Sequence, residues 1–149
     1  MSTTVRAQGD ELIAERRLSA APATVWTAFT TPEHLAAFWG GRHATVPVSS
    51  VRVDLRPDGE FSLETRAPDG RTSRLRFVYE QIEPPTLLVL REPRTGLSTS
   101  IRIEASGDGS MLTVHQRRLP PELRTAEAAT GLGGIVDLLA EHLDADPAS

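Results

Sequence analysis

The sequence contains no cysteine, which excludes disulfide bonds, thiolate metal sites and cysteine nucleophiles. No stretch approaches the roughly 18 consecutive apolar residues that a membrane-spanning helix needs. The first segment, MSTTVRAQGDE, lacks the apolar centre of a secretory signal. These absences predict a cytoplasmic protein that does not insert into a membrane and is held together by packing.

A concentration of positive charge is also missing. All 16 basic residues are arginines, they are spread along the chain, and the formal net charge is −4. Nucleic-acid binding normally requires a concentrated basic face. We therefore expect no nucleic-acid partner.

The sequence lacks the common catalytic motifs. It has no G-x-S-x-G elbow, no phosphate-binding glycine loop and no H-E-x-x-H pair. Its four histidines do not have the helical spacing of a metal site, and we interpret them as surface or structural groups: His34, His43, His115 and His142. We assign no catalytic residue, no metal ligand and no cofactor, and leave open whether the protein is an enzyme.

What remains is a chain of 149 residues, 39% of them hydrophobic, which is enough for one domain with a real core. We expect a flexible tail over residues 1–9, one domain over 10–144 and a C-terminal tail over 145–149. Even spacing of apolar residues predicts a strand from Glu11 that ends before Pro22. Two short helices follow, one beginning at Pro22 and one at Pro32.

From Ser50 to Arg118 apolar and polar residues alternate, and the turn sequences RPDG, APDG and GDG divide the segment. This pattern predicts six antiparallel strands, or seven with the first. After Pro121, one apolar stripe predicts a long C-terminal helix: Leu132, Ile135, Val136, Leu139 and Leu143.

Four segments in order resemble one known family: APATVWTAFTTPEHLAAFWG, DLRPDGEF, IEPPTLLVL and DLLAEHL. Across Leu12 to Leu143 the chain is similar to the activator of heat-shock-protein-90 ATPase homologue family, within the START-like (SRPBCC) helix-grip superfamily. The resemblance implies an α+β fold, in which a curved antiparallel sheet wraps around the C-terminal helix and encloses an apolar cavity. Members of the superfamily include ligand carriers, cyclases or aromatases and co-chaperones.

Two positions depart from the pattern of that family. The chain has Asp58 and Gly59 where Gly-Gly is common, and this pair still suits a turn. In the last helix it has Gly134 and Ile135 where Gly-Trp is common. Loss of the large ring either enlarges the cavity or is filled by another side chain.

The strand alternation also predicts which residues face the cavity, because every second side chain lies on the same face of a sheet. Polar residues Thr65, Tyr79, Thr99 and Gln116 share the inward faces, where they either orient a ligand or bond to the ends of the sheet. The candidate ligand-binding residues are Trp39, Phe61, Leu63, Leu75, Phe77, Tyr79, Thr99, Ile101, Gln116, Leu132, Ile135, Val136 and Leu139.

Three further side chains each have more than one interpretation. Arg16 shares the inward face of the first strand, and its partner is a ligand carboxylate, a protein carboxylate or solvent. Phe38 and Trp39 belong either to the ordinary core or to the wall of a ligand site, and Gly40 and Gly41 behind them end the helix.

Three functions are consistent with these observations. The first is binding of a small, largely apolar molecule, aromatic molecules included, in the cavity. The second is a co-chaperone-like interaction module with a filled interior, and the third is a cyclase or dehydratase that uses Tyr79 or Gln116 to move protons. Pairing of an edge strand with a second copy would give a homodimer, although the sequence does not indicate which face.

Overall fold

The computed structural model describes residues 3–145 and contains three α-helices and eight strands in that range. The strands are β1 (Thr4–Gln8), β2 (Glu11–Leu18), β3 (Arg52–Val53), β4 (Glu60–Arg66), β5 (Thr72–Glu83), β6 (Leu87–Arg91), β7 (Ser98–Ser106) and β8 (Gly109–Arg117). The helices are α1 (Pro22–Thr30), α2 (Pro32–Phe38) and α3 (Ala126–Ala145), with short 3₁₀ turns η1 (Gly41–His43), η2 (Val48–Ser50) and η3 (Pro121–Leu123). No described helix is both long enough and apolar enough to span a membrane.

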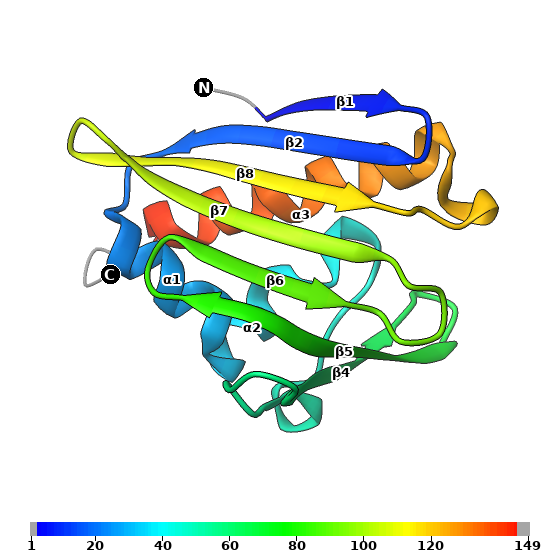
Figure 1. Cartoon of the computed structure of the whole chain (residues 1–149). Coiled ribbons are helices and arrows are strands. Elements are labelled where there is room, and N and C mark those ends of the chain that lie inside the picture. Colours follow the sequence, from blue (N-terminus) through cyan, green and yellow to red (C-terminus); the bar gives the residue numbers. More distant parts are fainter. Residues whose placement is uncertain (1–2, 146–149) are drawn as a thin grey trace.

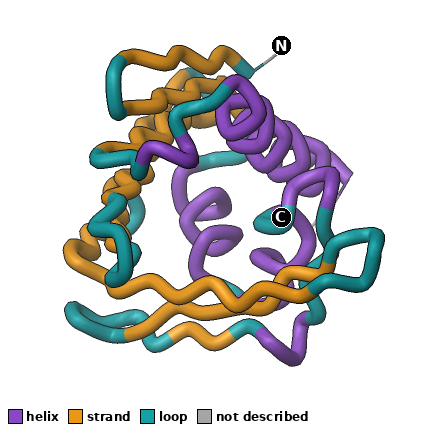
Figure 2. Tube along the Cα trace, turned by 90° about the vertical axis from the view of Figure 1, so that its right-hand side faces the viewer, coloured by secondary structure: helices purple, strands orange, loops and turns teal. Residues whose placement is uncertain are grey.

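All eight strands form one antiparallel sheet in the order β1-β2-β8-β7-β6-β5-β4-β3. The sheet curves, and α3 lies along its concave side with α1 and α2 below it (Figure 1). The view in Figure 2 shows the three helices gathered inside this curve. The arrangement confirms the expected α+β helix-grip fold.

The apolar residues of the strands meet across the sheet as the alternation predicts. Phe61 is paired with Phe77 and Ile101 with Val114, and all four are buried on the concave face. Burial of such pairs contributes roughly 25 cal/mol for each Å² of apolar surface removed from water. The register of the sheet therefore follows from the need to cover this one face.

The N-terminus differs from the prediction. Of the tail expected over residues 1–9, Thr4–Gln8 instead form β1 and pair with Glu11–Glu15 of β2, and residues 1–2 lie outside the described range. The sheet consequently has eight strands rather than six or seven. Of the expected C-terminal tail, Ala145 is the last residue of α3, and residues 146–149 lie outside the described range.

The first strand of the alternating segment, before the RPDG turn, is also shorter than its apolar spacing suggests. Only Arg52 and Val53 pair with β4, and Leu55 is 39% exposed. The turn that follows is as expected. A side chain at Gly59 would lie 2.0 Å from the carbonyl oxygen of Asp54, so only glycine fits there.

The two adjacent aromatic residues at the end of α2, Phe38 and Trp39, lie in different environments. Phe38 is 1% exposed and packs edge-on against Phe29, with 5.4 Å between ring centroids, so it belongs to the core. Trp39 is only partly buried. Gly41, with a φ of 69°, reverses the chain in a left-handed conformation that favours glycine.

Candidate functional site

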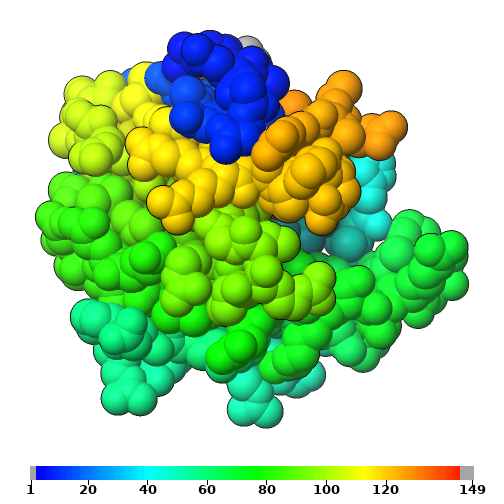
Figure 3. Space-filling view, turned by 45° about the vertical axis from the view of Figure 1, so that its right-hand side comes forward, coloured from blue at the N-terminus to red at the C-terminus, as the bar shows by residue number. Residues whose placement is uncertain are grey.

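A cavity of about 590 Å³ lies between the concave face of the sheet and α3. Ligand pockets in proteins typically measure roughly 300–1,000 Å³. Figure 3 shows the surface hollowed between the orange segment that contains η3 and the green β4–β5 hairpin, with the light-green β6–β7 turn beside it. The cavity is therefore large enough for a small organic molecule and is open on this side.

The mouth of the cavity forms where β6 ends early. β5 pairs with β6 only from Val78 onward, because β6 stops at Arg91, which is opposite Val78. The preceding residues of β5 continue beyond β6, and the β6–β7 turn, residues 92–97, lines the cavity together with them. A short strand in the middle of the sheet thus leaves the interior accessible.

Ten of the thirteen predicted site residues line this cavity. They come from α2–η1, the sheet and α3: Trp39, Leu75, Phe77, Thr99, Ile101, Gln116, Leu132, Ile135, Val136 and Leu139. Trp39 stands edge-on to Phe77, with 5.9 Å between ring centroids, and to Phe61 at 5.1 Å. It therefore forms a wall of the cavity, supported by the aromatic rings of β4 and β5.

The other three predicted residues, Phe61, Leu63 and Tyr79, do not line the cavity. Each is at most 1% exposed. Phe61 lies between two rings, stacked on Phe77 at 5.5 Å and on Tyr79 at 6.4 Å. These residues face inward as predicted, but they are covered by other side chains and form the core that supports the cavity.

The Tyr79 hydroxyl makes no hydrogen bond within the described part of the chain. Burial, and in addition the negative charge of Asp54, raises the pKa of the Tyr79 phenol well above its usual value. A group of this kind stays protonated at neutral pH. It also lies outside the cavity, so it is not placed to exchange protons with a bound molecule there.

Charged side chains line the rim. Glu92 accepts hydrogen bonds from the backbone N–H and the Oγ1 of Thr95, at 2.7 and 2.6 Å, and so fixes the β6–β7 turn. Burial acts to raise the pKa of Glu92, but the hydrogen bonds from Thr95 and the nearby Arg94 outweigh it, and the net shift is downward. Glu92 is therefore ionised at neutral pH, and Glu122 of η3 adds a second carboxylate to the rim.

The arginines at the cavity are engaged elsewhere or point into solvent. Arg74 donates to Ser62 Oγ at 3.1 Å, and Arg76 pairs with Glu60 at 3.1 Å. The side chain of Arg94 is 89% exposed. Among the described residues, none of these cations is placed to neutralise an anion deep in the cavity.

Arg16 has a protein carboxylate as its partner. Its Nη1 lies 2.9 Å from Oδ1 of Asp137 on α3, and the same nitrogen is 3.3 Å from the hydroxyl of Thr3. The ion pair joins β2 to the outer side of α3. Of the three interpretations, the pairing with a protein carboxylate is confirmed.

The histidines do not line the cavity. Nδ1 of His34 and Nε2 of His142 are 2.7 Å apart, which joins α2 to α3, and His115 pairs with Glu11 at 2.5 Å. These contacts fit the structural role that their spacing in the sequence predicts.

Other residues of the cavity were not singled out from the sequence. Val114 lines the cavity and shares the alternation of Gln116 on β8, so the same pattern in the sequence indicates it. Turn residues 92–95 and 97, Pro120 just before η3, and Leu123 of η3 line the mouth. These residues show no periodic pattern in the sequence. Their place in the site depends on where the neighbouring strands end.

The curved antiparallel sheet, its C-terminal helix and the cavity between them define a helix-grip domain. The model of one family, Activator of Hsp90 ATPase homolog 1-like protein, matches residues 19–144. The chain belongs to this family. No curated protein matches the chain.

Solved structures from bacteria have the same fold. A protein from Nitrosomonas europaea has 22% sequence identity and a TM-score of 0.83, with 93% of this chain and 97% of that one covered. A protein from Rhodobacter sphaeroides has 23% identity and a TM-score of 0.82, with 97% and 99% covered. CalU16 from Micromonospora echinospora has 20% identity and a TM-score of 0.73, with 99% and 87% covered. At these identities the similarity concerns the fold.

Proposed function

We propose that the protein binds a small, largely apolar molecule in the cavity between the sheet and α3. The observation that carries this proposal is the cavity itself, about 590 Å³ in volume, 14 of whose 23 lining residues are apolar or proline. Domains with this fold generally bind hydrophobic ligands. Burial of about 250 Å² of apolar ligand surface would contribute roughly 6 kcal/mol before the costs of association.

Aromatic rings in the wall favour a flat, aromatic ligand. Trp39, Phe77 and Phe29 all line the cavity. Aromatic pairs in edge-to-face or offset-stacked geometry gain about 0.5–1.5 kcal/mol beyond the area that they bury. A planar ring next to Trp39 would benefit from this term as well as from burial.

Of the two alternatives, the interaction module predicts a filled interior and an exposed apolar patch. The cavity weighs against it, and the exposed large hydrophobic residues, Val48, Leu55 and Leu123, come from three separate segments. The enzyme alternative keeps only Gln116 of its two candidate groups in the cavity. Binding is therefore the function that the geometry supports best.

Filling the cavity from α3 tests the proposal. Ile135 lines the cavity where a tryptophan is common in the family, so Ile135→Trp should occupy ligand space and weaken binding of N-phenyl-1-naphthylamine, an uncharged fluorescent probe, at least tenfold. Glu127→Trp adds the same ring to an exposed position of α3 outside the cavity and should leave the affinity unchanged. Equal affinities of wild type and Ile135→Trp would refute the proposed site.

A further inference from the structure

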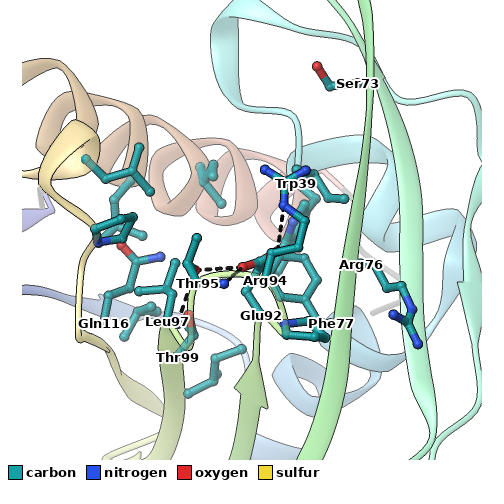
Figure 4. Close-up of a pocket in the computed structure, with 18 of the residues that line it drawn as sticks. Trp39, Ser73, Arg76, Phe77, Glu92, Arg94, Thr95, Leu97, Thr99 and Gln116 are labelled. Atoms are coloured by element: carbon teal, nitrogen blue, oxygen red, sulfur yellow. Dashed lines mark hydrogen bonds and ion pairs between the residues drawn. The ribbon is translucent and has the colours of Figure 1, made fainter.

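Two polar side chains interrupt the apolar wall at one place. Thr99 of β7 and Gln116 of β8 are directly opposite each other in the sheet, and both line the cavity. Figure 4 shows them close together at one side of the pocket, with Arg76 on the opposite side. Thr99 is only 5% exposed.

Neither side chain has a hydrogen-bond partner among residues 3–145. Both polar ends therefore face the cavity, where water or a ligand can satisfy them, because a hydroxyl or amide without any partner is unfavourable. The threonine hydroxyl and the glutamine amide each offer one or more donors and an acceptor. Together they match a ligand group that both donates and accepts, such as a carboxamide or a hydroxyl.

The position beside Thr99 and Gln116 does not suit an anionic ligand group. The arginines that border the cavity are bonded to Ser62 and Glu60 on the other face of the sheet or exposed to solvent, as described above. An ionised group in the interior would lose its hydration without gaining an opposite charge. At the rim, Nε of Arg94 lies 4.0 Å from a carboxylate oxygen of Glu92, so this arginine already has an anionic partner.

We infer that Thr99 and Gln116 form a polar subsite that selects an uncharged ligand with one hydrogen-bonding group over the corresponding carboxylate. This inference rests on the proposed function, because it specifies the chemical class of molecule bound in the same cavity. The apolar body of the ligand lies against Trp39 and α3, and its neutral polar group lies between the Thr99 hydroxyl and the Gln116 amide.

Four probes with one ring system test the subsite: naphthalene, 2-naphthamide, 2-naphthoate and (2-naphthyl)methylammonium. Their dissociation constants can be measured by equilibrium dialysis against the full chain at neutral pH. We expect 2-naphthamide to bind about fivefold more tightly than naphthalene, since a neutral hydrogen bond contributes modestly. We expect 2-naphthoate to bind more than about tenfold more weakly than 2-naphthamide.

Two shape-conserving variants test whether Thr99 and Gln116 cause the preference for 2-naphthamide over naphthalene. Thr99→Val and Gln116→Leu should each reduce the ratio of 2-naphthamide affinity to naphthalene affinity by about threefold or more, whatever their effect on naphthalene binding itself. Thr113→Val on β8 and Gln81→Leu on β5 make the same chemical changes outside the cavity and should not alter it. Because naphthalene affinity is measured on every variant, a misfolded protein is recognised as one that has lost binding to both probes.

The possible outcomes distinguish failure of the polar subsite from failure of the proposed function. If wild type binds none of the four probes, the proposed function fails together with the inference. If naphthalene binds but 2-naphthamide has no advantage, or if the advantage survives in both Thr99→Val and Gln116→Leu, the function stands and the subsite is refuted. Tighter binding of 2-naphthoate or of the ammonium probe than of 2-naphthamide would also overturn it.

Discussion

Tyr79 is the residue whose environment differs most from its sequence-based interpretation. It faces inward from β5 as predicted, yet it is fully buried between the aromatic core and the turn at Asp58 and Gly59, and its hydroxyl has no partner in the described residues. Alternation along a strand gives the face on which a side chain lies. It does not tell how far along that face the cavity extends.

Replacement of Tyr79 by phenylalanine should therefore stabilise the protein. The change removes a buried hydroxyl without a partner and keeps the ring stacked on Phe61, and we expect the free energy of unfolding to rise by about 1 kcal/mol. Urea denaturation of both proteins gives this difference. A loss of stability on Tyr79→Phe would mean that the hydroxyl is hydrogen-bonded in solution.

The raised pKa of Tyr79 also predicts a dependence on pH. Above about pH 10 the phenol ionises in the unfolded chain but stays protonated in the folded one. The folded state then binds more protons, so the free energy of unfolding falls as pH rises, by up to about 1.4 kcal/mol for each pH unit. The titration of Tyr79 therefore leaves the free energy of unfolding unchanged below about pH 10 and lowers it above that pH.

The composition makes this measurement clean, since Tyr79 is the only tyrosine and lysine is absent. Near-ultraviolet absorbance should show no phenolate in the native protein at about pH 11 and about nine-tenths ionisation in denaturant. In Tyr79→Phe the decline in stability that starts at about pH 10 should disappear. Normal ionisation of the native phenol would contradict the burial of this group.

Among the elements, α3 carries three glycines in its N-terminal half. The apolar stripe of this helix was predictable because it repeats over several turns, and Leu132, Val136 and Leu139 are buried as expected. The role of the glycines was not predictable, because it depends on what approaches each one. Gly133 lies against β1, whose burial pattern is largely exposed and which therefore gave no periodic signal.

Alanine substitutions should distinguish these glycines. A methyl group at Gly131 would meet no atom within 4 Å, so Gly131→Ala should stabilise the protein by about 1 kcal/mol through helix propensity. A methyl group at Gly133 would lie 3.2 Å from Cγ2 of Val5, so Gly133→Ala should gain less. In a Val5→Ala background the two substitutions should become equal.

Thermal or urea denaturation of wild type, the two glycine variants, Val5→Ala and the two double variants measures these differences. An equal gain from Gly131→Ala and Gly133→Ala with Val5 in place would mean that β1 does not pack on α3 as the structure has it.

For the whole molecule, the general architecture follows from the sequence because every strand and helix has one apolar face to bury. The site is predictable from the sequence in part, because the inward faces of the sheet and helices bring ten predicted residues around one cavity. Its mouth was not predictable, since it arises where β6 ends at Arg91 and the following turn, fixed by Glu92 and Thr95, joins the wall. The position of the mouth depends on where the strands end, and not on the alternation of apolar and polar residues within any strand.

Native mass spectrometry of the protein purified from its own cell extract tests the central claim most directly. We predict an additional mass of a small molecule on the wild-type chain that is lost on denaturation and is absent from Ile135→Trp purified in parallel. Glu127→Trp should retain it. A wild-type native mass equal to that of the polypeptide alone, under conditions in which N-phenyl-1-naphthylamine also fails to bind, would contradict the account of the cavity as a ligand site.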